Sequence, residues 1–215
     1  IGGLYSSTAT ISVLARKSRK ASEQEATDYV AAMLLAVSMM FLRFMILILI
    51  FSREIFLSIY PYLLTMAVVA AIVAWFIHSR QKRSNDQPVE EEEDDSSNPL
   101  EFKVALIFAV LFVIFTFLTH YTLVYAGTGG LNLLSFVSGF SDITPFILNL
   151  LQNTGSVAAL IITACSMQAI ISNIMVNMFY ALFFAGKGSK LRPWILGGFG
   201  VVIACNLVLL LFFYI

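Results

Sequence analysis

The sequence predicts an all-α polytopic membrane protein, arranged as an inverted repeat of transmembrane helices with two broken or re-entrant polar segments. Three observations carry this prediction: the composition, the order of the apolar segments, and paired motifs in the two halves of the chain. Of the 215 residues, 59% are hydrophobic and 12% are charged, whereas a soluble domain carries about 25% charged residues. The mean hydropathy is +0.87, which is typical of a chain that lies in a lipid bilayer.

Five segments are long and apolar enough to cross a bilayer as helices, which takes about 20 residues each. In chain order they are Thr27–Phe51, Phe56–Ile77, Phe102–Tyr125, Ser156–Ala185 and Pro193–Ile215. Residues 80–101, between the second and the third, combine a basic cluster with a run of six acids. A segment of this composition has no apolar face to bury. We therefore expect it to be a solvated, poorly ordered linker.

Short motifs recur in the same order before and after this linker. The stretch "VAAMLLAVSMM" at Val30 pairs with "VAALIITACSMQ" at Val157 if one residue is inserted. The stretch "YPYLL" at Tyr60 pairs with "RPWIL" at Arg192, and each opens the last helix of its half. The opening "GLYSSTATISVL" pairs with "GFSDITPFILNL" at Gly139. These pairs predict an internal duplication, with residues 1–79 and 102–215 as its halves.

The second half has an additional leading helix, Phe102–Tyr125, and its counterpart is expected before Ile1. Basic residues indicate the topology, because short loops rich in Lys and Arg stay in the cytoplasm. The three basic clusters are Arg16–Lys20, Arg80–Arg83 and Lys187–Arg192. All three face the cytoplasm only if the stretch between the third and fourth spans enters and leaves on the outer side.

That stretch, Leu131–Asn153, is therefore predicted to be re-entrant, and by the repeat Gly2–Lys20 would be re-entrant from the cytoplasmic side. With three crossings in a complete unit, the two halves have opposite orientations, as in many transporters and channels. Irregular backbone at membrane depth is tolerated only where protein or water satisfies it. Inverted halves would bring the N-termini of two short helices together near the midplane.

Both re-entrant segments contain small and hydroxyl residues, which supply permissive backbone and N-cap oxygens for a short helix. The residues expected to contact a solute there are Ser6, Ser7, Thr8, Gly139, Ser141, Asp142 and Thr144. The alternative is that both segments are kinked spanning helices packed through small residues.

Two charged residues lie inside the apolar regions, where a charge is costly and indicates a functional site. Asp142 is the only acid after Glu101, and Arg43 lies within Thr27–Phe51. The eight residues from Arg43 to the end of its helix span about 12 Å, too far for the side chain to reach the interface. Arg43 is therefore expected to face the bundle, where it could pair with Asp142. The alternative role for Asp142 is an N-cap near the interface.

Asn173 and Asn177, four residues apart, form a polar stripe on the fourth span that either lines a pore or joins helices. The two cysteines, Cys165 and Cys205, sit inside apolar runs and indicate neither a disulfide framework nor a metal site. No nucleophile triad or phosphate-binding loop occurs in the sequence. We therefore expect no catalytic residues, no metal ligands and no cofactor.

Several of these motifs resemble a known family. The opening "GGLYSSTAT" at Gly2, the basic "LARKSR" after it, and Arg43 in mid-helix resemble an uncharacterised bacterial membrane domain found C-terminal to MgtC/SapB-type modules. "SGFSD" at Ser138 and "SNIMVN" at Ser172 resemble its later motifs. In that pattern a lysine commonly stands where this chain has Asn177. The resemblance implies a bacterial protein whose MgtC-like module lies outside these residues, in the same full-length chain.

Two classes of function fit these expectations. The first is a transporter or channel for a small inorganic ion or polar solute, with its site where the two broken segments meet. The second is a non-transporting regulatory or scaffolding membrane protein of the MgtC-related type. The expected location is the bacterial inner membrane, with the charged linker in the cytoplasm. The expected partners are the lipid bilayer, a small ion or solute and further copies of the chain, but no nucleic acid.

Overall fold

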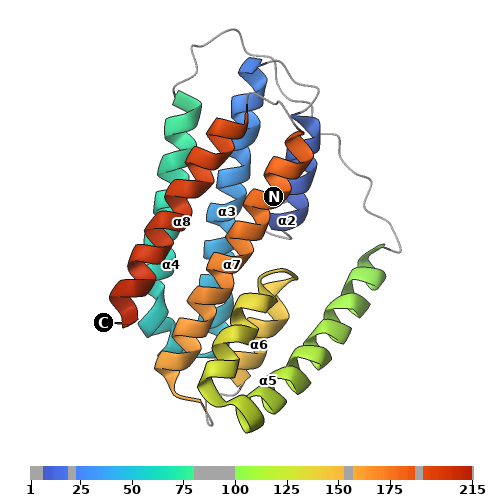
Figure 1. Ribbon diagram of the computed structural model, residues 1–215, viewed down its shortest axis with the longest axis vertical. Helices are drawn as coiled ribbons and strands as arrows, with labels where there is room; N and C mark the ends of the chain where they lie inside the picture. Colours follow the sequence, from blue (N-terminus) through green and yellow to red (C-terminus); the bar gives the residue numbers. More distant parts are fainter. Residues whose placement is uncertain (1–6, 19–22, 80–99, 153–156, 187–190, 215) are drawn as a thin grey trace.

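The computed structural model describes residues 7–18, 23–79, 100–152, 157–186 and 191–214, and within these ranges every regular element is a helix (Figure 1). The charged run of the linker and Ser6 lie outside the described residues. In chain order the helices are α2 (Ser7–Lys17), α3 (Glu23–Phe51), α4 (Arg53–Ser79), α5 (Leu100–Ser138), α6 (Ile143–Gln152), α7 (Ala159–Ala185) and α8 (Arg192–Tyr214).

Five of these helices contain a stretch that is long and apolar enough to cross a membrane, which confirms the prediction of a multi-pass helical protein. The stretches are Thr27–Phe51, Arg53–Ser79, Ala109–Gly127, Ala159–Ala185 and Arg192–Phe212. Four of them agree with the predicted spans to within a few residues. The third ends two residues later than predicted, and the helix then bends and continues.

The bend in α5 is at Gly127, which has φ 59° and ψ −150°. This combination is open to glycine and strained for any residue with a Cβ atom. After it come two shorter apolar helices, Gly129–Ser138 and Ile143–Gln152, joined by the non-helical residues 139–142. The predicted break at Gly139–Thr144 is therefore present over its first four residues. The bend at Gly127 is an additional break that the sequence did not predict.

Helix α7 forms the centre of the bundle, with 72% of its apolar stretch buried. Its buried face consists largely of small residues, among them Ala164, Ser166, Ala169 and Ser172, which allow neighbouring helices to approach closely. The core of the bundle also contains fully buried aromatic rings, including Phe41, Phe44, Phe146 and Phe199.

Helix α5 lies at the edge of the bundle and is mostly uncovered (Figure 1). Only 11% of the stretch Ala109–Gly127 is buried. It contacts α6 through the rings of Phe115 and Phe146, with centroids 5.7 Å apart, and through Thr116 Oγ1, which accepts a 2.9 Å hydrogen bond from Asn149 Nδ2. Its exposed side chains include large apolar residues such as Val110, Phe117 and Val124, which are suited to lipid.

Polar side chains join the spans at two buried places. The Tyr62 hydroxyl on α4 donates to Oδ1 of Asn206 on α8, whose Nδ2 donates to the Val202 carbonyl at 2.8 Å. The Ser38 hydroxyl on α3 donates to the Ala67 carbonyl on α4 at 2.8 Å. Hydrogen bonds of this kind fix helix pairs in an apolar solvent, where packing alone is less directional.

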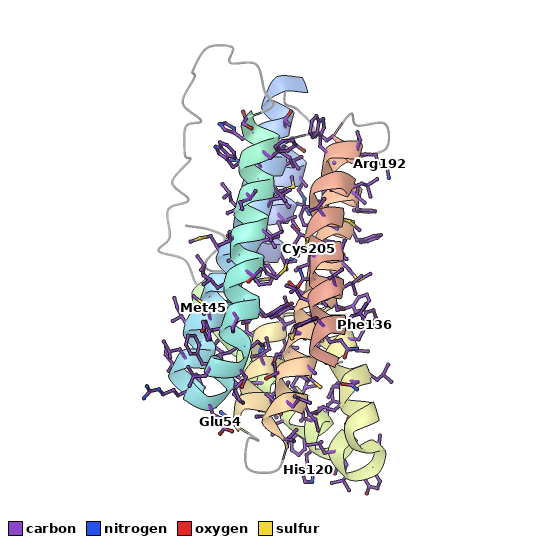
Figure 2. All side chains as sticks on the ribbon, turned by 90° about the vertical axis from the view of Figure 1, so that its left-hand side faces the viewer. Met45, Glu54, His120, Phe136, Arg192 and Cys205 are labelled. Atoms are coloured by element: carbon purple, nitrogen blue, oxygen red, sulfur yellow. The ribbon has the colours of Figure 1, made fainter. Side chains whose placement is uncertain are left out.

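The ends of the bundle differ in charge. Helix α2 ends in Arg16 and Lys17, and that end lies at the same end of the bundle as the start of α8 (Figure 1). Glu54 and His120 lie at the opposite end from Arg192 (Figure 2). This distribution agrees with the expectation that the described basic residues of α2 and α8 share one side. Helix α3 runs away from that end, and α7 runs toward it (Figure 1).

Candidate functional site

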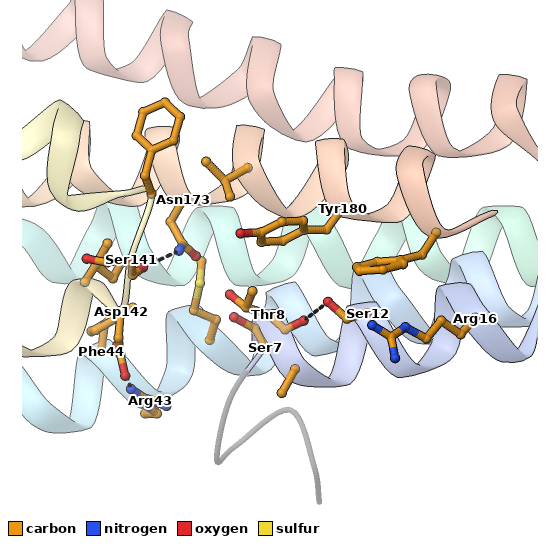
Figure 3. A pocket seen from close by; sticks show the side chains of 16 residues that line it. Ser7, Thr8, Ser12, Arg16, Arg43, Phe44, Ser141, Asp142, Asn173 and Tyr180 are labelled. Atoms are coloured by element: carbon orange, nitrogen blue, oxygen red, sulfur yellow. Dashed lines mark hydrogen bonds and ion pairs between the residues drawn. The ribbon is translucent and has the colours of Figure 1, made fainter. Parts of the chain in front are cut away.

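A cavity of about 550 Å³ lies between α2, the middle of α3, the turn before α6, and α7. Its polar lining residues are Ser7, Thr8, Ser12, Arg16, Arg43, Ser141, Asp142, Asn173 and Tyr180. Apolar contacts come from Ala9, Met40, Phe44, Phe140, Ile143, Val176 and Phe184. The polar groups follow α2 from Arg16 at one end of the cavity to Arg43 and Asp142 at the other (Figure 3).

Asp142 begins α6 as its N-cap. Its Oδ1 accepts a 2.9 Å hydrogen bond from the backbone N–H of Thr144, one of the donors that the first turn of a helix leaves without an intrahelical partner. A carboxylate at this position also interacts favourably with the helix dipole. The preceding helix ends at Ser138. Ser141 and Asp142 then follow, and both residue types are favoured at the N-cap of a helix, so the local sequence explains why α6 begins here. The N-cap reading of Asp142 is therefore confirmed.

Arg43 reaches the same turn from α3. Its Nη2 lies 4.0 Å from Asp142 Oδ1 and donates a hydrogen bond to the Thr144 hydroxyl. The Arg43 and Asp142 side chains are 25% and 51% exposed, so this is a partly solvated ion pair at the wall of the cavity. The expected pairing of Arg43 with Asp142 is thus confirmed, and the carboxylate that pairs with Arg43 is also the N-cap of α6.

Helix α7 holds the turn from the other side. Ser172 Oγ donates to the Phe136 carbonyl at 2.7 Å, and Asn173 Nδ2 donates to the Gly139 carbonyl at 3.2 Å. The same amide lies 3.5 Å from the Ser141 carbonyl (Figure 3). A Cβ atom on Gly139 would come within 2.4 Å of Ser172 Cβ and 2.7 Å of the Asn173 nitrogen. Glycine is required here by the close approach of the two backbones.

Asn177 lies one turn further along α7 and is fully buried. Its Nδ2 donates to Asn173 Oδ1 at 3.1 Å, while its own Oδ1 has no hydrogen-bond partner in the described part of the chain. Asn177 does not line the cavity. The two residues of the predicted polar stripe therefore differ in position. Asn173 binds the turn and lines the cavity, whereas Asn177 lies outside the cavity lining and donates a hydrogen bond to the Asn173 side chain.

The other end of the cavity is formed by aromatic and basic side chains. The Arg16 guanidinium carbon lies 4.4 Å from the centre of the Phe184 ring, a cation–π contact. Tyr180 lies one turn before Phe184 on the same face of α7 and also lines the cavity (Figure 3). Ser12 donates to the Thr8 carbonyl at 2.8 Å, so its hydroxyl oxygen remains available as an acceptor.

The structure thus brings most of the sequence-predicted site residues together around one cavity. Ser7, Thr8, Arg43, Ser141, Asp142 and Asn173 line it, and Gly139 and Thr144 shape its wall. Ser6 lies outside the described residues. Sequence reasoning missed Ser12, Arg16, Tyr180 and Phe184. A helical spacing was available as a signal, since Thr8, Ser12 and Arg16 are each four residues apart.

These features define a multi-pass helical membrane protein with a polar cavity between α2, α3, α7 and the turn before α6. The chain belongs to the family described as a domain of unknown function (DUF4010), whose model matches residues 1–185. It is similar to an uncharacterized protein of Aquifex aeolicus (strain VF5), with 25% identity over 212 residues, or 98% of this chain and 90% of that protein. No solved structure matches it.

Proposed function

We propose that this protein is an integral membrane transporter or channel for a small inorganic ion or polar solute, and that the solute binds in the cavity between Arg16 and Arg43. The observation that carries the proposal is the lining itself. Charged and hydroxyl groups from four separate elements converge on one space inside a chain that is otherwise strongly apolar. Ionisable groups within transmembrane segments are expensive, and in most membrane proteins they mark a solute or ion pathway.

The directions of the helices support an inverted repeat. Helix α2 runs from the cavity toward the basic end of the bundle, whereas α6 runs from the cavity toward the opposite end (Figure 1). Helices α3 and α7, which carry the paired motifs at Val30 and Val157, also run in opposite directions. Transporters built from inverted repeats bind their substrates where the broken helices of the two halves meet.

The bend at Gly127 and the turn at residues 139–142 support a re-entrant segment in the second half. The helices Gly129–Ser138 and Ile143–Gln152 contain only ten residues each, which corresponds to about 15 Å and half of a bilayer core. A pair of half-length helices that returns to its starting side leaves Arg192 and Arg16 on one side, which we take to be the cytoplasm.

The apolar side chains of α6 support the interpretation that the cavity opens toward that cytoplasmic side. Phe146, Ile147 and Leu150 of α6 are fully buried and fill the region on the far side of Asp142. Arg16, at the other end of the cavity, is exposed. In this interpretation the described conformation is open to the cytoplasm and closed to the outside of a bacterial inner membrane.

A non-transporting regulatory or scaffolding role of the MgtC-related type is the second candidate. It is favoured by the first stretch of α5, of which only 11% is buried, because a span that is not covered by its own chain is available to another protein or a further copy of the chain. An MgtC-like module in the full-length chain would fit this role. Neither candidate assigns catalytic residues, so we propose no enzymatic activity.

A flux assay on the purified protein in liposomes tests the first candidate. Vesicles loaded with potassium sulfate, sodium nitrate or sodium phosphate are diluted into impermeant buffer, and ion release is followed with ion-selective electrodes. We expect release of at least one ion above protein-free vesicles, and a change of at least severalfold in that release for Asp142→Asn. Glu54→Gln, at the opposite end of the bundle, is the matched control. No release from folded, inserted protein would favour the regulatory role.

A further inference from the structure

We propose that the cavity binds a small anion. This inference rests on the proposed function, because it names the class of solute for the same site. The proposed function leaves the sign of the solute's charge open, because helix N-termini and Arg43 suit an anion or a neutral solute, whereas Asp142 suits a cation. The positions of four groups around the cavity decide between them.

The first observation is the balance of formal charge. The lining contains the guanidinium groups of Arg16 and Arg43 and a single carboxylate, that of Asp142. The sum over these three groups is one positive charge. In a partly desolvated space, an excess charge of this kind attracts ions of opposite sign and repels those of the same sign.

The second observation is that the carboxylate already has partners. Asp142 Oδ1 accepts the Thr144 N–H at 2.9 Å and lies 4.0 Å from Arg43 Nη2. A metal cation bound at Asp142 would need further oxygen ligands and would lie beside the guanidinium. Among the described residues, no group of three His, Cys, Asp or Glu side chains is arranged to hold a metal ion. The single acid is therefore occupied as a cap and as a partner for Arg43.

The third observation is Ser7, at the start of α2. Its side chain is 7% exposed and lines the cavity (Figure 3). Its hydroxyl group can donate a hydrogen bond to an anion. Helix α2 has no acidic residue in its first turn, so the positive end of its dipole is not neutralised there, in contrast to the capped α6.

The fourth observation is the guanidinium at the mouth. Arg16 contacts the Phe184 ring and has no carboxylate within 4.0 Å in the described chain. A guanidinium held by an aromatic ring keeps its outward N–H groups available for an anion. An anion entering past Arg16 and Tyr180 would reach the Ser7 hydroxyl and then the positive charge of the Arg43 guanidinium.

Calorimetric titration of the detergent-purified protein tests this inference without requiring transport. The probes are the sodium salts of chloride, nitrate, sulfate, phosphate and acetate, and the potassium and magnesium salts of MES, all at constant ionic strength in MES–bis-tris propane buffer. We expect saturable binding of at least one anion and no saturable binding of either cation. The Kd for that anion should rise at least tenfold in Arg43→Gln and at least threefold in Arg16→Gln.

Arg53→Gln, which changes an exposed arginine outside the cavity, is the matched control and should leave the Kd unchanged. Arg16→Gln keeps the test decisive if Arg43→Gln does not fold, because Arg16 is exposed. The inference is overturned if no anion binds saturably, or if magnesium or potassium binds and Asp142→Asn abolishes that binding. Anion binding without flux in liposomes would overturn the proposed function alone, and flux of a cation with no anion binding would overturn the inference alone.

Discussion

Arg43 on α3 and Asp142 at the start of α6 face each other at 4.0 Å, and Thr144 connects them because its hydroxyl accepts from Arg43 and its N–H donates to Asp142. Each of the two charges is therefore tied to the other and to one turn of backbone. This arrangement gives the capping residue two separable properties, its hydrogen bond to the helix and its charge.

Substitutions at Asp142 should separate these properties. Asn retains the N-cap acceptor, so Asp142→Asn should change the free energy of unfolding by only a few tenths of a kcal/mol, whereas Asp142→Ala should cost about 1 kcal/mol. Both should alter solute binding, because both remove the charge beside Arg43. Thermal or denaturant unfolding in mixed micelles measures the first effect. Equal stability of the two variants would contradict the capping role.

Gly139→Ala should displace the turn from α7. The added Cβ atom would lie 2.4 Å from Ser172 Cβ and 2.7 Å from the Asn173 backbone nitrogen, and backbone cannot move aside cheaply. We expect a loss of about 1–3 kcal/mol in unfolding free energy, as for other overpacked sites. The control is Gly129→Ala, where a Cβ atom would meet nothing within 4 Å. A Gly139→Ala protein as stable as that control would show that the close approach is not rigid.

Gly127→Ala should destabilise the protein for a different reason. No atom lies within 4 Å of a Cβ atom built there, but φ is 59°, and a residue with a side chain is strained in this region by about 1–3 kcal/mol. Gly200→Ala, in the helical interior of α8 and also without a neighbour within 4 Å, should instead be neutral or slightly stabilising. Unfolding measurements should therefore show a lower free energy of unfolding for Gly127→Ala and an unchanged or slightly higher one for Gly200→Ala.

Tyr62→Phe should weaken the contact between α4 and α8, because Asn206 Oδ1 would lose its donor in a buried position. Interhelical hydrogen bonds in membrane proteins contribute about 0.6 kcal/mol on average and up to about 1.7. Tyr60→Phe is the control on the same helix, since Tyr60 is exposed and stacks on Phe56 with centroids 5.6 Å apart. A double-mutant cycle with Asn206→Leu would isolate the pair, and a coupling energy of zero would contradict it.

Much of the fold could be predicted from the sequence, because apolar length alone identifies membrane spans. Arg43 and Asp142 could also be predicted as partners, since each is an isolated charge in apolar surroundings with few alternatives. The first prediction depends on the apolar length of each span and the second on the cost of moving a charge out of water, and both can be judged locally in the sequence.

Other features depend on contacts that the sequence does not express. Arg16 occurs among several basic residues, and such a cluster is explained equally well by topology, so its place at the mouth of the cavity was not evident. Gly127 is followed closely by Gly129 and Gly130 in an apolar helix, and nothing local distinguishes the one that adopts a positive φ. The division between Asn173 and Asn177 depends on which side of α7 meets the turn.

The uncovered first stretch of α5 makes the lipid a structural component of this protein. A helix held by few protein contacts takes its tilt from the thickness of the surrounding hydrocarbon layer, and Gly127 joins this helix directly to the segment that packs on α7. Acyl-chain length is consequently a variable to control in every measurement on the cavity. A preparation in short-chain lipid and one in long-chain lipid would present the same residues with α5 at different tilts.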